Sequence, residues 1–242
     1  MEYDDRRYYY RKDLHKVADW LMSFRDKLTE EFMTHNSDFF DEYAKGQTFD
    51  NTRGNKFNVW KLQGIRFKWP EKDIDCYPGK DYSAELLEMY PTACHIADEL
   101  GDHCPILQYS AIDPKSHIPR HTGPENVDAK FIRIHIPLII PEGNIWFECE
   151  GEDIDWTDIW GFNNQYSHSA YNRSDKRRLI LLIDISREFL GIAPAHPYDE
   201  ERFQREAKKT YVKHLPSENI TLTCTIDDLW NITYTETPYA GE

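Results

Sequence analysis

Two histidines occupy polar turns that the sequence places at the ends of predicted strands. His121 opens the turn His121-Thr-Gly-Pro, and His168 closes the polar stretch 163–168. Neutral imidazole nitrogens are suitable ligands for a mononuclear iron ion. One loop histidine by itself is more often an ordinary surface residue, so the hypothesis depends on the order in which these histidines alternate with arginines.

The clearest predicted strand, residues 131–140, carries an arginine and a histidine on one face. Side chains alternate across a strand, so the isoleucines at 132, 134 and 136 share one side, whereas Arg133 and His135 share the other with Phe131. This pattern is typical of a strand with one solvated face. It is equally typical of a barrel strand whose inner side binds an anion, because a buried arginine needs a carboxylate or phosphate partner.

A second arginine, Arg178, begins the apolar strand Leu179-Ile-Leu-Leu-Ile. A guanidinium fork matches a carboxylate through two parallel hydrogen bonds, so Arg178 is a candidate ligand for an organic acid. The alternative is a structural salt bridge to Asp184 or to another acid of the core. The order histidine, Arg-x-His strand, histidine, arginine therefore predicts an iron site with an organic-acid cosubstrate.

The composition is that of an acidic globular protein. The 242 residues include 29 Lys+Arg and 43 Asp+Glu, a formal net charge of −14, and 40% are hydrophobic. Nucleic-acid partners are disfavoured, because each phosphate contact needs a local cation, whereas a small anion in a basic site is not. We expect neither a membrane span nor a secretory signal. The five cysteines are odd in number and lack a CxxC spacing, so we expect reduced thiols and a cytoplasmic protein.

The candidate residues need strands to position them, and the sequence predicts many short ones. From Ile106 to Ile185 apolar segments alternate with turn signals, which favours a barrel or a sandwich over alternating β–α units. Gly143-Asn144 predicts a hairpin turn between a strand at 131–140 and one at 145–150. The acidic stretch 148–158 lies between the two histidines, and we expect a solvated hairpin there.

Helices are predicted on both sides of this strand-rich region. Apolar residues at helical spacing predict a helix over 13–32, with Asp13 as its N-cap, and a second helix over 84–100. After the strand-rich region, charge and hydropathy patterns predict a helix over about 199–210 and an edge strand over 220–226.

Six short motifs follow one another between Leu28 and Glu188. They are Tyr90-Pro-Thr-Ala, Tyr109-Ser-Ala-Ile-Asp-Pro, His121-Thr-Gly-Pro-Glu-Asn, Arg133-Ile-His135, His168 with Tyr171-Asn172, and Arg178-Leu-Ile-Leu-Leu-Ile-Asp184. Each is common alone, whereas the ordered set is fairly specific. In this order they resemble the aspartyl/asparaginyl β-hydroxylase family of iron- and 2-oxoglutarate-dependent dioxygenases.

The resemblance implies a fold. It is mainly β with flanking helices, a double-stranded β-helix, which is a jelly-roll, cupin-like barrel. We expect residues 1–242 to form a single catalytic domain. Within it, 13–105 supply N-terminal helices and an outer strand, 106–188 form the jelly-roll core with the iron site, and 189–242 form a C-terminal extension.

The resemblance also implies roles for matching positions. His121 and His168 are expected to bind Fe(II), and Arg178 is expected to pair with the distal carboxylate of 2-oxoglutarate. These three residues form the predicted catalytic set. The further cosubstrate contacts that it implies are Ser110, Arg133 and His135. Candidate contacts for the polar end of the substrate are Arg120, Lys130, Trp146 and Asn164.

The chain differs from the wider iron/2-oxoglutarate class at one site and departs from the family pattern at two others. Gly123, two residues after His121, has no side chain where many iron/2-oxoglutarate enzymes have a metal-binding carboxylate, although animal members of the family share this glycine. Asn163-Asn164 stands where members often have two aspartates, and Ser169 where they often have a glutamate. A position left open at Gly123 would also admit chloride, which is the basis of a halogenase alternative.

The implied activity is oxidation of an unactivated C–H bond by dioxygen, with release of succinate and CO2 from 2-oxoglutarate. We expect hydroxylation of an amino-acid-like small molecule or of an Asp or Asn side chain in a peptide or protein, without a nucleic-acid or membrane partner. The alternatives are the halogenase, a non-catalytic cupin-like binding module, and a jelly roll that binds a phosphate or sugar at Arg133 and Arg178. The oligomeric state is left open.

Overall fold

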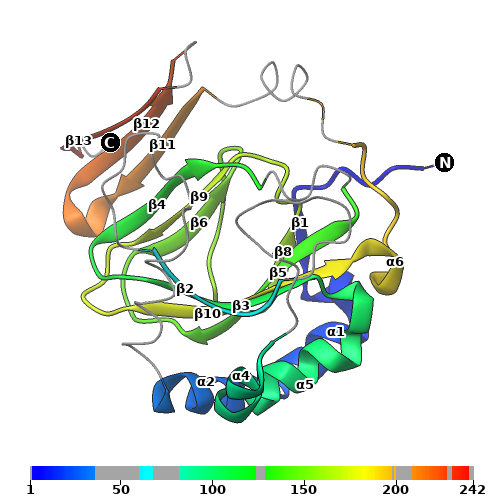
Figure 1. The fold of residues 1–242 in the computed structure, drawn as a ribbon. Coiled ribbons are helices and arrows are strands. Elements are labelled where there is room, and N and C mark those ends of the chain that lie inside the picture. Colours follow the sequence, from blue (N-terminus) through cyan, green and yellow to red (C-terminus); the bar gives the residue numbers. More distant parts are fainter. Residues whose placement is uncertain are drawn as a thin grey trace.

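The computed structural model describes residues 2–35, 60–67, 82–123, 129–197, 199, 209–227 and 231–239. Strands dominate these ranges, and helices lie along one side of them (Figure 1). The strands are β1 (Tyr8–Tyr10), β2 (Trp60–Phe67), β3 (Ile106–Ile112), β4 (Ser116–His121), β5 (Phe131–Ile139), β6 (Ile145–Cys149), β7 (Glu152–Ile154), β8 (Trp160–Phe162), β9 (His168–Asn172), β10 (Arg178–Ser186), β11 (Thr210–Leu215), β12 (Ile220–Ile226) and β13 (Ile232–Pro238). The helices are α1 (Arg11–Met22), α2 (Arg25–Thr34), α4 (Ala84–Met89), α5 (Pro91–Leu100) and α6 (Arg187–Leu190), with short 3-10 helices at Gly101–His103 and Pro216–Glu218.

The strands form three sheets, with the orders β1-β8-β5-β10-β3-β2, β4-β9-β6-β7 and β11-β12-β13. Between β3 and β10 the chain passes repeatedly from the first sheet to the second and back, and the pairings are antiparallel. The order β8-β5-β10-β3 facing β4-β9-β6-β7 is that of a double-stranded β-helix. The predicted jelly roll with flanking helices is therefore confirmed.

The predicted hairpin between 131–140 and 145–150 is wrong. β5 pairs with β8 and β10, whereas β6 pairs with β7 and β9 in the other sheet. All residues of β5 except the last are buried, so both of its faces are covered and it takes a central place in its sheet. The turn at Gly143, whose φ of 124° favours glycine, instead carries the chain from one sheet to the other.

Both predicted N-terminal helices are interrupted. The helix predicted over 84–100 is broken by Pro91 into α4 and α5, because proline disfavours the helical conformation of the preceding residue and suits a first helical position. The helix predicted over 13–32 is likewise two helices, α1 and α2. Its predicted cap, Asp13, lies inside α1, where its carboxylate accepts a hydrogen bond from the Tyr10 N–H at 2.9 Å.

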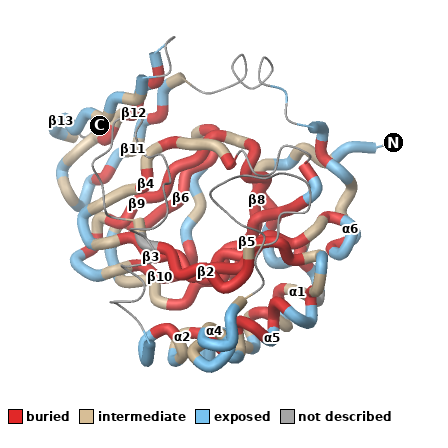
Figure 2. The backbone as a smooth tube through the Cα atoms, in the orientation of Figure 1, coloured by how far each residue is buried: buried red, intermediate tan, exposed pale blue. Residues whose placement is uncertain are grey.

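Three apolar clusters join the layers, and the strands between them are largely buried (Figure 2). The first lies between the helices and the outer face of the six-stranded sheet, and it includes the β5 isoleucines at 132, 134 and 136. The second lies between the six- and four-stranded sheets, and the third between the four-stranded sheet and the C-terminal sheet. The alternation predicted for β5 is confirmed, and Arg133 and His135 face the interior between the two sheets.

The C-terminal extension contributes the third sheet. The strand predicted over 220–226 is confirmed as β12, but its predicted edge position is wrong, because β12 pairs with β11 on one side and β13 on the other. The helix predicted over 199–210 falls largely outside the described residues. Tyr211 and Leu222 of this sheet pack against Trp146 of the four-stranded sheet. The extension therefore covers the outer side of the sheet that carries both candidate histidines (Figure 1).

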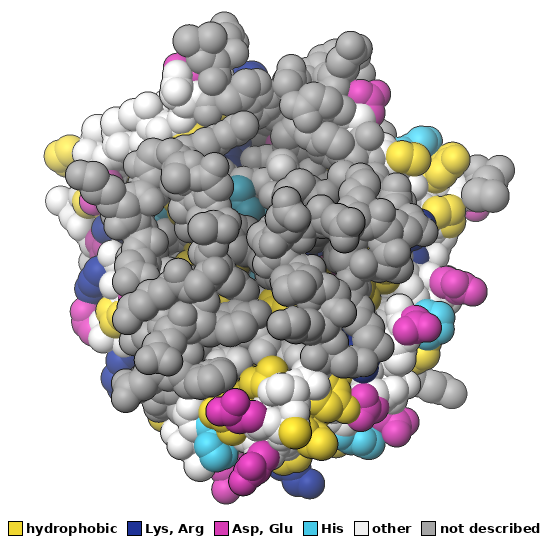
Figure 3. All heavy atoms as spheres, in the orientation of Figure 1, with side chains coloured by type: hydrophobic (Ala, Val, Ile, Leu, Met, Phe, Trp, Pro, Cys, Tyr) yellow, Lys and Arg dark blue, Asp and Glu magenta, His cyan; other side chains and the backbone are white. Residues whose placement is uncertain are grey.

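Exposed acidic side chains lie on the helical side of the molecule, along the lower edge of the face in Figure 3. None of the helices in the described ranges has the length and apolar character needed to cross a bilayer. Cys94, Cys104, Cys149 and Cys224 are buried free thiols, and Cys76 lies outside the described residues.

Candidate active site

The two predicted metal-binding histidines lie side by side. His121 ends β4 and His168 begins β9, and the two residues pair directly across the antiparallel ladder. Their ring centroids are 4.3 Å apart. Two turns that are distant in the sequence therefore bring their histidines to one point of the four-stranded sheet.

Both histidines are held in the tautomer that suits a metal. The Nδ1 of His121 bonds to the carbonyl of Pro119 at 2.7 Å, and that of His168 to the carbonyl of Tyr166 at 2.8 Å. A carbonyl only accepts, so each Nδ1 donates and the neutral ring carries its lone pair on Nε2. Burial lowers the pKa of His168 well below its ordinary value, and the neighbouring His121 lowers it further. The His168 imidazole is thus neutral, as metal binding requires.

The described residues bring two candidate metal ligands, His121 and His168, to this point. Within the described ranges, no group of three or more His, Cys, Asp or Glu side chains is arranged to hold a metal ion. A Cβ atom at Gly123 would lie 2.2 Å from the side-chain nitrogen of Asn164, and the Gly123 N–H donates to the Asn164 carbonyl at 2.7 Å. A carboxylate at position 123 would therefore require Asn164 to move, and the space beside Gly123 is filled by an amide.

Arg178 is a buried cation on β10, 1% exposed. Its Nη1 donates to the Ser110 carbonyl at 3.2 Å, and its guanidinium lies over the Trp156 ring at 4.6 Å. Its Nε has no hydrogen-bond partner, and no acidic side chain of the described ranges pairs with it. Burial lowers the pKa of Arg178 to about 9. A guanidinium in such surroundings is stabilised by an anion that the described protein does not supply.

Arg133 has the partner that Arg178 lacks. Its Nε and Nη2 each donate to the Asp184 carboxylate at 2.8 Å, and both side chains are buried. Asp184 lies directly opposite Arg133 on β10, about 20 Å of strand away from Arg178. The alternative salt bridge between Arg178 and Asp184 is therefore wrong. The contact of Arg133 with a cosubstrate stays a prediction.

His135 presents an N–H group to the same interior. Its Nδ1 accepts a hydrogen bond from Trp156 Nε1 at 3.2 Å, so the proton of the neutral ring is on Nε2. Burial lowers the pKa of His135 well below its ordinary value, and the positive charges of Arg178 and Arg133 lower it further. Trp156, which no sequence pattern singles out, therefore orients both His135 and Arg178.

Ser110 connects the arginine to the histidine side of the interior. Its carbonyl accepts from Arg178, and its hydroxyl accepts from Trp60 Nε1 at 3.0 Å. The ring centroids of Trp60 and His121 are 5.7 Å apart. The predicted site residues that the structure places around this interior are Ser110, His121, Arg133, His135, His168 and Arg178.

Two candidate substrate contacts point away from this interior. Arg120 precedes His121, so strand alternation turns it to the outer face, where it forms an ion pair with Glu148. Trp146 stacks on Tyr171, with ring centroids 4.4 Å apart, beneath the C-terminal sheet. The solvated hairpin expected over 148–158 is wrong at its start, because Glu148 and Glu150 are both buried.

Aromatic rings close the space around the histidines. Phe147 and Phe162 pack on the His168 ring at centroid distances of 5.4 and 4.9 Å, and Trp160 packs on His135 at 4.5 Å. Apolar walls of this kind exclude water and strengthen the electrostatic contacts inside them. The arrangement can therefore hold a divalent metal on two imidazoles and an organic acid on the guanidinium.

Comparison with known proteins gives a family. A sequence model described as Aspartyl/Asparaginyl beta-hydroxylase matches residues 26–188. The human protein of that name is 26% identical over 134 residues, 54% of this chain and 15% of the human one. The Rhizobium tropici protein named Ornithine lipid ester-linked acyl 2-hydroxylase is 32% identical over 80 residues, 31% of this chain and 27% of that one. The matched stretches are thus a minor part of both relatives.

Solved structures give more distant similarities. A prolyl hydroxylase from Trichoplax adhaerens, in complex with a hypoxia inducible factor peptide, aligns with 75% of this chain and 94% of its own at 12% identity and a TM-score of 0.39. An oxidoreductase of the 2OG-Fe(II) oxygenase family from Burkholderia pseudomallei aligns with 58% of this chain and 73% of its own at 13% identity and a TM-score of 0.36.

Proposed function

This chain belongs to the aspartyl/asparaginyl β-hydroxylase family of hydroxylases, and we propose that it uses Fe(II) and 2-oxoglutarate. The observation that carries the proposal is Arg178, a buried guanidinium without a described counterion, in the interior that also receives the two histidines. A 2-oxoglutarate carboxylate would supply both the missing negative charge and two hydrogen-bond acceptors. The Nε2–H of His135 is a further donor to such an acid.

The histidine pair fits iron. Both Nδ1 atoms are fixed by carbonyls, so the Nε2 atom of each ring keeps a lone pair for a metal. Two protein ligands leave coordination positions for a chelating acid and dioxygen. When bound, iron and 2-oxoglutarate supply the oxidising chemistry, in which dioxygen is consumed, a C–H bond is hydroxylated, and succinate and CO2 are released. The protein's part is to hold the ligands in place and to exclude water with its aromatic walls.

The proposed substrate is an amino-acid-like small molecule, or an Asp or Asn side chain of a peptide or protein. The name of the human relative refers to aspartyl and asparaginyl groups, whereas that of the R. tropici relative refers to an acyl chain of an ornithine lipid. The halogenase alternative has no supporting observation; beside Gly123 the structure places the Asn164 amide.

Metal and cosubstrate titrations test this proposal. Metal-free full-length protein is titrated with Co(II), followed by its visible absorption, and then with 2-oxoglutarate. We expect saturable binding of both, and loss of the metal site in His121→Ala and in His168→Ala. His214→Ala is the control, because His214 is an exposed histidine of β11.

Fe(II)-dependent formation of succinate, measured with free amino acids and with Asp- and Asn-containing peptides, then identifies the substrate class. Failure of the wild type to bind either metal or 2-oxoglutarate would overturn the proposal.

A further inference from the structure

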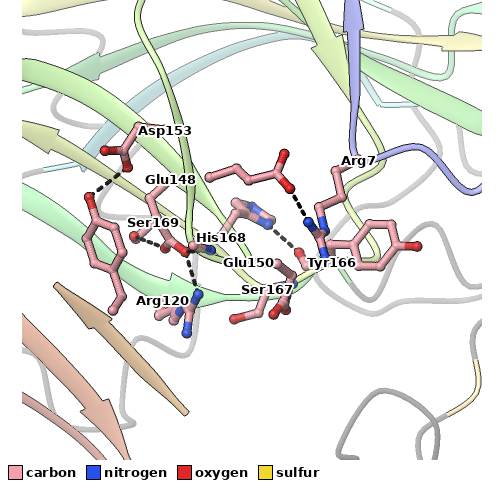
Figure 4. A network of polar contacts seen from close by, with 12 residues as sticks. Arg7, Arg120, Glu148, Glu150, Asp153, Tyr166, Ser167, His168 and Ser169 are labelled. Atoms are coloured by element: carbon pink, nitrogen blue, oxygen red, sulfur yellow. Dashed lines mark hydrogen bonds and ion pairs between the residues drawn. The ribbon is translucent and has the colours of Figure 1, made fainter. Parts of the chain in front are cut away.

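The residues next to the two histidines meet on the other side of the sheet. Arg120 precedes His121 and Ser169 follows His168, so strand alternation turns both of them to the outer face. There both contact one carboxylate, that of Glu148 on β6 (Figure 4). The Ser169 hydroxyl donates to Glu148 Oε2 at 2.8 Å, and Arg120 Nη2 forms an ion pair with Oε1.

Glu148 contacts both β4 and β9, the strands that carry the two histidines. It lies directly opposite Ser169 in the β6–β9 ladder and is fully buried beneath the C-terminal sheet. The Gly151 N–H donates to Oε1 as well, so the carboxylate is fixed from its own strand end. A buried ion pair is unscreened by solvent, and breaking it by removing one partner is strongly unfavourable. Each histidine is therefore one peptide unit away from a side chain fixed to the same carboxylate.

The backbone before His121 needs such support. Pro119 has no N–H group, and the register of β4 against β9 shifts between Ile118 and His121, so the ladder is interrupted there. The Arg120 N–H donates instead to the Tyr234 hydroxyl of β13 at 2.9 Å. This segment is therefore held by contacts from outside its own sheet pairing.

The turn that joins β6 to β7 also holds the backbone before His168. The Ser167 N–H donates to Glu150 Oε1 at 3.1 Å, and the Glu150 N–H donates to the Ser167 carbonyl at 3.1 Å. Glu150 is buried. The strand end that carries Glu148 thus contacts the segments before and after His168 as well as the residue before His121.

We propose that Glu148 is a positioning residue of the metal site, which joins Arg120 to Ser169 and thereby fixes the separation and orientation of His121 and His168. The inference rests on the proposed function, in which these histidines bind metal. Residues behind metal ligands that orient them commonly affect metal affinity about 10- to 100-fold. Glu148 would do so through two neighbouring side chains.

A matched control lies directly across the ladder. Asp153 on β7 is the cross-strand partner of Glu148, and its carboxylate accepts from the Tyr211 hydroxyl at 2.7 Å and from Lys213 at 2.6 Å. Both partners belong to β11, and neither is next to His121 or His168. Glu148→Gln and Asp153→Asn therefore both remove a carboxylate charge at the same interface, but only the first releases Arg120.

The experiment is Co(II) titration of the metal-free, full-length wild type and variants, with affinity and visible d–d spectrum as readouts and thermal unfolding as a check on folding. We expect Glu148→Gln to weaken Co(II) binding about 10- to 100-fold and to alter the spectrum, Ser169→Ala to weaken it less, and Asp153→Asn to leave affinity and spectrum as in the wild type. Equal Co(II) affinity and spectrum in Glu148→Gln and Asp153→Asn would overturn the inference, since a merely structural contact changes only the unfolding temperature.

Two further outcomes are decisive. If Glu148→Gln does not fold, Ser169→Ala decides, because it removes a single hydroxyl, and wild-type Co(II) affinity and spectrum in that variant would overturn the inference. If the wild type binds Co(II) no better than His121→Ala, the proposed function itself fails, and this result is distinct from a wild type that binds tightly with an unaffected Glu148→Gln.

Discussion

Two arginines of the six-stranded sheet face the same interior, and one of them is paired while the other is not. Arg133 is joined to Asp184 by two hydrogen bonds of 2.8 Å. Arg178 has a backbone carbonyl and the Trp156 ring as neighbours, and no acidic side chain of the described ranges pairs with it. Both are buried, at 8% and 1% exposure.

Under the proposed function, this difference distinguishes a charge that stabilises the fold from a charge that binds the cosubstrate. A complete ion pair needs nothing from outside, and its removal as a unit is often nearly neutral for stability. A single buried cation is unfavourable for the ligand-free fold, and a bound acid relieves that cost. The comparison therefore assigns Arg133 mainly to the fold and Arg178 mainly to the cosubstrate, and the following variants test that division.

The largest effect on stability is expected when the Arg133–Asp184 ion pair is broken. Arg133→Met removes the guanidinium that donates two hydrogen bonds to the buried Asp184 carboxylate, so we expect the free energy of unfolding to fall by about 3–5 kcal/mol. Denaturant unfolding of the metal-free protein measures it. The double variant Arg133→Met/Asp184→Leu is the control and should recover most of the loss. A single variant as stable as the wild type would show that the pair does not have this structural role.

Arg178→Met should weaken cosubstrate binding without lowering the stability of the ligand-free protein. It removes a charge without leaving another unpaired, so the ligand-free protein should unfold at the same or a higher denaturant concentration. Binding of 2-oxoglutarate should weaken by about 2–5 kcal/mol, a Kd increase of at least about 30-fold. Calorimetric titration with 2-oxoglutarate, in the presence of Co(II), measures it. Unchanged 2-oxoglutarate affinity would show that Arg178 does not bind the cosubstrate.

Sequence reasoning could reach the direction of these side chains but not their partners. Strand alternation alone places Arg133 and His135 on one face of β5, and the structure confirms this. Which arginine meets Asp184 depends on the register between β5 and β10, and that register follows from the packing of both faces of the whole sheet. The same limit explains the wrong hairpin, because Gly143-Asn144 carries a turn signal whether the next strand joins the same sheet or the opposite one.

The residues that were missed owe their roles to tertiary packing. Glu148 belongs to an acid-rich stretch, for which solvation is the usual outcome, and it is buried because the C-terminal sheet covers β6. Trp156 lies between β7 and β8 and reaches His135 and Arg178 only through the closure of the jelly roll. Neither contact has a local spacing that a single sequence displays.

Trp156 offers a smaller test of the cosubstrate side. Trp156→Phe removes the indole N–H that orients His135 and weakens the ring contact with Arg178, so we expect the Kd for 2-oxoglutarate to rise about five- to tenfold. Trp146→Phe is the matched control, since Trp146 donates to the Tyr211 hydroxyl at 2.8 Å on the outer face. Equal 2-oxoglutarate affinities in the two variants would contradict the orienting role of Trp156.

The smallest effect concerns a half-buried histidine outside the interior, His117. His117 of β4 packs between Tyr171 and Tyr234, and burial lowers its pKa, with Arg173 lowering it further and Glu236 opposing them. As the pH falls below about 6.5, the unfolded imidazole takes up a proton that the folded one does not, so stability is lost between pH 6.5 and the folded pKa. His117→Phe should therefore lose less stability than the wild type between pH 6.5 and 5.5, by at most about 1 kcal/mol. His135 and His168 contribute alike to the wild type and to His117→Phe, so the difference in denaturant unfolding between these two proteins reports on His117. Identical slopes of unfolding free energy against pH would show that the pKa of His117 is not lowered by burial.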